Sequence, residues 1–233
     1  YPKPAEFFGD LDKRGYRVVL WMTPMVNSES KEGKIAIADS REWYEKARGD
    51  GYLAGGGSQV GWWMGRGGFI DYTNPAAMKW WRGMQSQVFE WGLDGWKLDD
   101  TATQFGFIYR GLNFPLPVPY LNANTGPMTT RQYMDHYYRD EYRHGLTKNP
   151  EFVTMSRSTD RIGLLDGEKR SEFVQWLDTI AHPEGFSPLD SSPVNWVGDQ
   201  DHAWPLEHEG IEEALTDILR SASMGYNVIG SDI

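Results

Sequence analysis

The chain has 233 residues, of which 39% are hydrophobic and 24% charged, with a formal net charge of -10 and no cysteine. This length suits one domain with a sizeable core, and the acidic balance argues against a nucleic-acid partner, because phosphate binding needs clustered Lys and Arg. The lack of cysteine excludes disulfides and thiolate chemistry. Neither a membrane span nor a signal peptide is expected, and the compartment stays open, with an extracytoplasmic or secreted location among the options.

Four segments carry the signals of helices. The clearest start is Asn74 as N-cap with Pro75 at the first helical position, followed by apolar residues at three- and four-residue spacing. Gly15, Gly92 and Gly225 are the expected ends of three of these helices. In chain order, the expected helices span residues 5–14, 75–91, 130–144 and 210–224.

Five apolar runs predict strands that alternate with these helices. In chain order, they span residues 17–22, 92–99, 151–156, 193–199 and 227–231. Strands separated by helices imply parallel pairing with right-handed crossovers. Two glycine-rich runs, residues 55–57 and 65–68, do not sit between a strand and a helix as a phosphate-binding loop does, so they are expected to form flexible loop.

Two of the five predicted strands end in carboxylates. Residues 92–99 read GLDGWKLD, and residues 193–199 read PVNWVGD. The carboxyl ends of parallel strands are where α/β barrels keep their catalytic residues. Paired carboxylates at two such ends favour glycoside hydrolysis, in which one group attacks or activates and the other protonates the leaving oxygen.

The same two motifs resemble glycoside hydrolase family 31. Residues 92–99 look like the family's nucleophile strand, and residues 196–199 look like its W-x-G-D acid/base segment. Further blocks resemble the family in the family's order, at residues 2–8, 18–24, 69–75, 156–158 and 230–233. The resemblance covers nearly the whole chain except residues 160–192, which are expected to form an insertion loop.

The resemblance implies an α/β fold, the (β/α)8 TIM barrel, with only about strands three to seven present. Residues 1–233 would then be a single catalytic domain that is incomplete at both ends, with the remaining parts of a larger catalytic chain as its partner. The implied activity is that of a retaining exo-α-glycosidase acting on an oligosaccharide or glycoconjugate through a covalent glycosyl-aspartate. No cofactor is implied, and the five histidines show no spacing typical of a metal site.

Asp99 matches the family nucleophile and Asp199 its acid/base residue, which in a retaining enzyme lie roughly 5–5.5 Å apart. Lys97, two residues before Asp99, is expected on the same strand face and would help to keep Asp99 ionised. Asp100 and Asp201 are rivals for the two roles, but alternation sends Asp100 to the other face, and Asp201 is expected to be a solvated loop charge.

Other matched positions are expected to contact substrate. Arg157 matches an arginine that binds substrate hydroxyls, a task that suits its planar fork of donors. Trp63 is expected to form a wall of the sugar pocket, His202 to reach substrate because it follows the acid/base residue closely, and Asp232 to lie at a strand tip in the pocket. Asp94 is instead expected to be structural, either pairing with a lysine or capping backbone amides.

Three departures bear on specificity. Thr23 stands where α-glucosidases of the family have an aspartate that grips the 4-hydroxyl of the sugar, Ala102 replaces a glutamate after the nucleophile motif, and the expected insertion reshapes the pocket rim. These departures favour an α-galactoside or α-N-acetylgalactosaminide. The open alternatives are an α-glucosidase, an α-xylosidase, a transglycosylase of the same family, and a non-catalytic carbohydrate-binding relative.

Overall fold

A computed structural model of the chain describes residues 3–30, 40–62, 65–99, 121–128, 130–160, 185–204 and 210–232. Its main feature is a five-stranded sheet whose strand order, β1-β5-β8-β11-β12, follows the order of the chain. All four pairings in this sheet are parallel. The strands are β1 (Val19–Met22), β5 (Gly95–Leu98), β8 (Val153–Ser156), β11 (Val194–Trp196) and β12 (Ile229–Gly230). The five predicted strands and their parallel pairing are therefore confirmed.

The four predicted helices are also confirmed. The Asn74 side chain accepts hydrogen bonds from the amides of Ala76 and Ala77, as an N-cap does. Gly15, Gly92 and Gly225 all have positive φ. The helices are α1 (Pro4–Lys13), α3 (Pro75–Glu90), α5 (Thr130–Lys148) and α7 (Ile211–Ser223), so α5 runs four residues beyond the predicted end.

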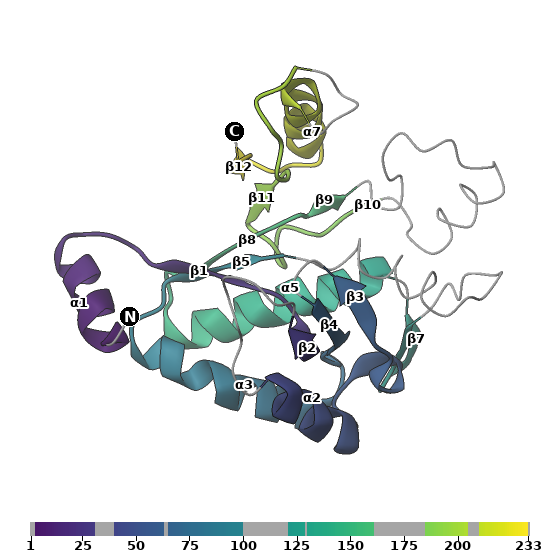
Figure 1. Ribbon diagram of the computed structural model, residues 1–233. Helices are drawn as coiled ribbons and strands as arrows, with labels where there is room; N and C mark the ends of the chain where they lie inside the picture. The colour runs from purple at the N-terminus through teal and green to yellow at the C-terminus, as the bar shows by residue number, and fades with distance from the viewer. Residues whose placement is uncertain are drawn as a thin grey trace, which may run out of the picture.

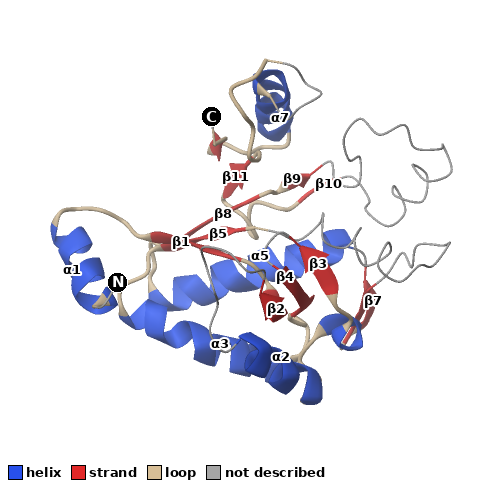
Figure 2. Cartoon of the chain, viewed as in Figure 1, coloured by secondary structure: helices blue, strands red, loops and turns tan. Residues whose placement is uncertain are grey.

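Figure 1 shows α3 and α5 side by side along one face of the main sheet, and α7 beside β11 and β12. Figure 2, coloured by element type, shows α3 and α5 lying along strands β1, β5 and β8. Strands alternating with covering helices in this way form the wall of an α/β barrel. In the part of the chain that the structure describes, no helix is long and apolar enough to span a membrane.

A second, antiparallel sheet lies outside the predicted elements. It has the order β2-β4-β3 and consists of β2 (Met25–Ser30), β3 (Val60–Trp62) and β4 (Gly65–Phe69). The prediction of loop for residues 65–68 is therefore wrong. A Cβ atom at Gly67 would lie 2.3 Å from the Val26 carbonyl oxygen, so glycine here permits close strand approach rather than flexibility. The remaining elements are α2 (Ser40–Gly49), η1 (Ala54–Gly57), β6 (Leu121–Ala123), β7 (Gly126–Met128), β9 (Thr159–Asp160) and β10 (Gly185–Phe186).

The start of the expected insertion, residues 160–192, pairs with a short strand that lies within that range. β9 and β10 form an antiparallel pair, and residues 161–184 between them lie outside the described residues. Ser187, Ser191 and Ser192 are fully buried, and the Ser187 amide donates to the Ser158 carbonyl oxygen at 2.8 Å. Ser187, Ser191 and Ser192 are therefore packed within the domain.

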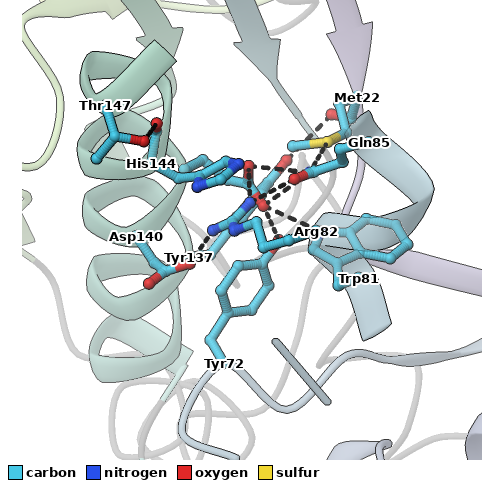
Figure 3. Close-up of polar contacts among 10 residues, drawn as sticks. Met22, Tyr72, Trp81, Arg82, Gln85, Tyr137, Asp140, His144 and Thr147 are labelled. Atoms are coloured by element: carbon cyan, nitrogen blue, oxygen red, sulfur yellow. Dashed lines mark hydrogen bonds and ion pairs between the residues drawn. The ribbon is translucent and has the colours of Figure 1, made fainter. Parts of the chain in front are cut away.

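A buried carboxylate, Glu141 of α5, ties α3 to α5 beneath the sheet. Figure 3 shows Tyr72, Trp81, Arg82 and Gln85 converging on one point beside α5. All four donate to the carboxylate of Glu141, which is fully buried: Tyr72 Oη at 2.7 Å, Trp81 Nε1 at 3.0 Å, Arg82 Nη1 at 2.6 Å and Gln85 Nε2 at 3.0 Å. Because the charge has a cationic partner and its oxygens are hydrogen-bonded, it is tolerated in the core.

The same network reaches β1. Gln85 Nε2 also contacts the Met22 sulfur at 3.2 Å, and Tyr137 Oη donates to the Met22 carbonyl oxygen at 3.1 Å. That carbonyl accepts the Asp99 amide at 3.0 Å as well. Helices α3 and α5 therefore fix the backbone at the carboxyl ends of β1 and β5 through these contacts with Met22.

Replacing Glu141 with Gln is expected to lower the free energy of unfolding by about 3–5 kcal/mol, because the guanidinium of Arg82 would lose its buried partner. Urea denaturation measures the change. The control is Asp190→Asn, which removes a partner of Arg139 and Arg143 at the surface and is expected to cost about 1 kcal/mol or less. Equal losses in the two variants would contradict a supporting role for the buried network.

Candidate active site

The candidate site begins with the alternation of side chains along β5. Leu98 is fully buried toward the helix layer, so its neighbours Lys97 and Asp99 project from the opposite face of the sheet. The Asp99 amide bonds to the Met22 carbonyl oxygen, which continues the pairing of β1 and β5 one residue beyond the strand. This pairing fixes the backbone of Asp99 at the carboxyl end of the sheet.

Asp199 reaches the same edge from β11. The Val197 amide donates to the Gly230 carbonyl oxygen at 2.8 Å, and the Asp232 amide donates to the Gly198 carbonyl oxygen at 3.4 Å. The segments that follow β11 and β12 therefore continue the backbone pairing of these strands as far as Asp199 and Asp232. Both carboxylates stand at strand ends, as the sequence predicts.

Arg157, directly after β8, bridges the two predicted catalytic carboxylates. Its Nε donates to Asp99 Oδ1 at 3.4 Å, and its Nη2 donates to Asp199 Oδ2 at 2.5 Å. Asp99 is buried, whereas the Asp199 side chain is 58% exposed. The structure thus brings together the predicted nucleophile, acid/base residue and arginine, which come from three neighbouring strands.

Gly198 makes room for this arrangement. Its backbone φ angle is +134°, a value that residues with a side chain rarely adopt. A Cβ atom there would lie 2.7 Å from Arg157 Nη1 and 2.9 Å from Gln200 Nε2. Glycine in the W-V-G-D motif is therefore required both by the backbone turn before Asp199 and by the approach of the guanidinium.

Trp196 forms a buried floor under two cations. The Lys97 ammonium lies 3.7 Å and the Arg157 guanidinium carbon 4.0 Å from the centroid of its ring, distances at which a cation is attracted to an aromatic face. The Trp196 Nε1 donates to Asp232 Oδ1 at 2.8 Å. The tryptophan of the motif therefore supports the charged residues of the site instead of filling core volume alone.

Lys97 lies on the same strand face as Asp99, as expected, and takes its ion-pair partner from another strand. Its ammonium is paired with Asp232 Oδ2 at 3.3 Å, while the cation beside Asp99 is Arg157. The reason is that Asp232, on the inward face after β12, meets the lysine across the floor provided by Trp196.

Asp94 is structural, as expected. Its Oδ2 accepts the Val18 amide at 2.8 Å and its Oδ1 accepts Asn149 Nδ2 at 3.1 Å. It lies near Arg17, at 3.7 Å, and not near a lysine. The aspartate at the start of the motif therefore anchors the entry of β1 and β5.

The electrostatics of the site favour a protonated Asp199. Its pKa is raised above the ordinary value, first because protein atoms displace part of its hydration, and further by a hydrogen bond to Asp232 and by the charges of Asp99 and Asp232, while Arg157 acts in the opposite direction. The pKa of Asp232 is lowered despite some desolvation, because Asp199, Lys97 and Trp196 all donate to it. Of these two carboxyls, Asp199 is therefore the one that holds a proton more strongly.

Replacing Asp232 with Asn is expected to shift the pH dependence of activity. The loss of the negative charge of Asp232 lowers the pKa of Asp199, so the alkaline limb, where a required acid loses its proton, should move to lower pH. The pH profile of kcat measures this shift. The control is Asp201→Asn, because Asp201 only caps its own loop, accepting the Ala203 amide at 2.7 Å. An unmoved or raised alkaline limb would contradict the assigned coupling.

The remaining predicted residues are less well tied to the site. Thr23 is 8% exposed and directly follows β1, and His202 is exposed on the loop after Asp199. Trp63, together with Asp100 and Ala102, lies outside the described residues. Among the described residues, no group of three His, Asp or Glu side chains could hold a metal ion.

Sequence reasoning missed Trp21. Its Nε1 donates to Asp99 Oδ2 at 2.9 Å. The register pairs Trp21 with Lys97, so both side chains project from the same face of the sheet as Asp99. The alternation of side chains along β1 is the signal that could have identified Trp21 as a site residue, because it places Trp21 on the same face of the sheet as Thr23.

A parallel sheet covered by helices, with two carboxylates at the carboxyl ends of strands on either side of β8, defines the chain as a barrel domain of the glycosidase type. The family described as "Glycosyl hydrolases family 31 TIM-barrel domain" matches residues 1–233. The chain therefore belongs to glycoside hydrolase family 31, a family of α-glycosidases.

Known relatives lie within this family. An "Alpha-xylosidase" of Emericella nidulans is 30% identical over 233 residues, covering 100% of this chain and 24% of the relative. An "Isomaltosyltransferase" of Sporosarcina globispora is 26% identical over 218 residues, covering 91% of this chain and 17% of the relative. A solved structure, the cycloalternan-degrading enzyme of Trueperella pyogenes in complex with isomaltose, superposes with a TM-score of 0.67 at 21% identity, over 100% of this chain and 28% of its own. This chain thus spans about a quarter or less of each of these relatives.

Proposed function

We propose that this domain is the catalytic centre of a retaining α-glycosidase that uses Asp99 as nucleophile and Asp199 as acid and base. The observation that carries the proposal is the joint binding of Asp99 and Asp199 by Arg157 at the carboxyl end of a parallel sheet. A retaining mechanism needs two carboxyls on one cleft, one ionised and one protonated. The raised pKa of Asp199 supports its assignment as the protonated member.

The steps follow from these roles. Asp99 attacks the anomeric carbon of an α-linked sugar while Asp199 gives its proton to the departing oxygen, which leaves a β-linked glycosyl ester on Asp99. Asp199, now ionised, takes a proton from water, whose oxygen attacks the same carbon. The C1–O bond to Asp99 breaks, its electron pair returns to the carboxylate, and the sugar leaves with its original α configuration.

For the sugar, we propose a gluco- or xylo-configured α-linked residue. The relatives named above are an α-xylosidase and an isomaltosyltransferase, and the solved neighbour holds isomaltose. None of the three is named an α-galactosidase, so the preference for an α-galactoside drawn from Thr23 loses its support. A buried threonine hydroxyl at the end of β1 is still able to accept or donate one hydrogen bond to a sugar hydroxyl.

Transfer to a sugar acceptor is the second candidate outcome. The isomaltosyltransferase relative favours it, and the same glycosyl ester serves both reactions, because water and a sugar hydroxyl attack from the side of Asp199. A non-catalytic binding role has less support, because binding alone does not need an acid with a raised pKa beside a second carboxylate.

We also propose that the rest of a larger chain completes the barrel. β1 and β12 each have one neighbour in the described sheet, and a closed barrel of this type has eight strands. The relatives are several times longer than this chain, which is consistent with further strands pairing along these two edges.

The decisive experiment is an assay of the full-length protein against nitrophenyl α-glycosides of xylose, glucose, galactose and N-acetylgalactosamine, with isomaltose as a disaccharide. Proton NMR of the first product gives its anomeric configuration. We expect an α-configured product from the xyloside or glucoside, and transfer products at high sugar concentration if an acceptor competes with water. A β-configured first product, or no turnover of any substrate, would overturn the proposal.

A further inference from the structure

Both oxygens of the proposed nucleophile have a hydrogen-bond donor. Arg157 Nε faces Asp99 Oδ1 at 3.4 Å, and Trp21 Nε1 donates to Asp99 Oδ2 at the shorter distance of 2.9 Å. The two donors come from β1 and from the end of β8, on either side of β5. The carboxylate is thus held between neighbouring strands.

Trp21 is unusual for a large aromatic residue on the central sheet. It is 41% exposed, whereas Trp96 of β5 and Trp196 of β11 are 5% and 4% exposed. Its ring therefore contributes less to the buried core than either of them. Its indole N–H donates to the proposed nucleophile, Asp99.

The value of such a donor differs between the two steps of the proposed mechanism. During formation of the ester, Asp99 begins as a full anion and its charge falls toward the transition state. During hydrolysis, the C1–O bond breaks and the charge on Asp99 grows. A hydrogen bond to this carboxylate therefore stabilises the transition state relative to the starting state in the second step only.

On this basis, and resting on the proposed role of Asp99, we propose that Trp21 is a positioning residue that stabilises Asp99 as the leaving group of the second step. The pairing of β1 with β5 fixes the position of the indole N–H, which donates to Asp99 Oδ2. This hydrogen bond stabilises the negative charge that returns to the carboxylate when the glycosyl ester is broken. Trp21 thereby sets the lifetime of the covalent intermediate.

The test compares Trp21→Phe with the parent enzyme in the full-length protein, using a nitrophenyl α-glycoside that the parent cleaves. Stopped-flow measurement of nitrophenol separates ester formation, seen as a burst, from the steady state. Loss of a hydrogen bond to a charged group is expected to slow the steady state about 10- to 100-fold. The burst rate should change by less than about threefold, and KM should fall as the ester accumulates.

The matched control is Trp43→Phe, a tryptophan of similar exposure, 39%, on α2, which packs on β2. It is expected to keep the parent kinetics. If Trp21→Phe does not fold, benzothienylalanine at position 21 serves instead, because sulfur replaces the N–H while the shape of the ring system is kept. Mass spectrometry of acid-quenched digests should show more glycosylated Asp99 in the variant than in the parent.

Equal slowing of the burst and the steady state, or an unchanged steady state, would overturn the role of Trp21. Failure of the proposed function looks different. In that case the parent enzyme itself, incubated with a slow fluorinated glycosyl fluoride, would carry no sugar on Asp99. The two failures are therefore distinguished by the labelled peptide of the parent.

Discussion

Asp199→Ala should leave an enzyme that azide reactivates with formation of an α-glycosyl azide. The variant keeps Asp99, so a substrate with a good leaving group still forms the ester, whereas an unactivated substrate should react about 10²- to 10⁴-fold more slowly. Azide enters the space left by the carboxyl group and attacks the β-linked ester with inversion. Product configuration is read by proton NMR.

Asp99→Ala should give the opposite result. Without the nucleophile no ester forms, activity should fall on the order of 10⁵-fold, and any rescue by azide should give a β-glycosyl azide, because the anion then attacks the α-linked substrate directly. A β-azide from Asp199→Ala would mean that the two roles are exchanged. The matched control is Asp100→Ala, which removes the neighbouring carboxylate and is expected to leave ester formation intact. If Asp100→Ala abolished ester formation and Asp99→Ala did not, Asp100 would be the nucleophile.

Arg157→Lys is expected to lower kcat/KM by about 10²- to 10⁴-fold, because a single ammonium cannot replace two charge-assisted hydrogen bonds to separate carboxylates. Since Arg157 opposes the rise in the pKa of Asp199, weakening this contact should also raise that pKa. The alkaline limb of the pH profile should then move to higher pH, opposite to the effect of Asp232→Asn.

The control for this substitution is Arg143→Lys, which makes the same change at an exposed ion pair with Asp190. It is expected to leave kcat/KM within about twofold, as surface pairs contribute little. Parent-like activity in Arg157→Lys would show that the two carboxylates do not depend on a shared guanidinium.

The central sheet and the positions of both carboxylates follow from local sequence signals. Caps such as Asn74, glycines after helices, and apolar runs before Asp99 and Asp199 act over a few residues, so they can be recognised without tertiary information. The alternation of strands and helices then fixes parallel pairing, and parallel pairing brings the strand ends to one edge.

Contacts that depend on register across strands could not be predicted in the same way. Alternation along the strand predicts that Lys97 shares a face with Asp99, but it does not reveal that the ammonium is paired with Asp232, 135 residues later in the chain. The donor Trp21 and the antiparallel β4 were missed for a related reason. A glycine-rich run signals flexibility or close packing equally well, and only the approach of Val26 to Gly67 decides between them.

Arg157 binds both Asp99 and Asp199, so in the proposed mechanism the formation of the ester on Asp99 changes the pKa of Asp199. While both carboxyls are free, the negative charge of Asp99 helps Asp199 to keep its proton. Once the sugar is attached, the ester on Asp99 carries no charge, so this repulsion disappears and the attraction of Arg157 is left to act on Asp199 alone. The proton affinity of Asp199 then drops just as its task changes from giving a proton to taking one. In the proposed mechanism, formation of the covalent bond thereby converts the acid into a base.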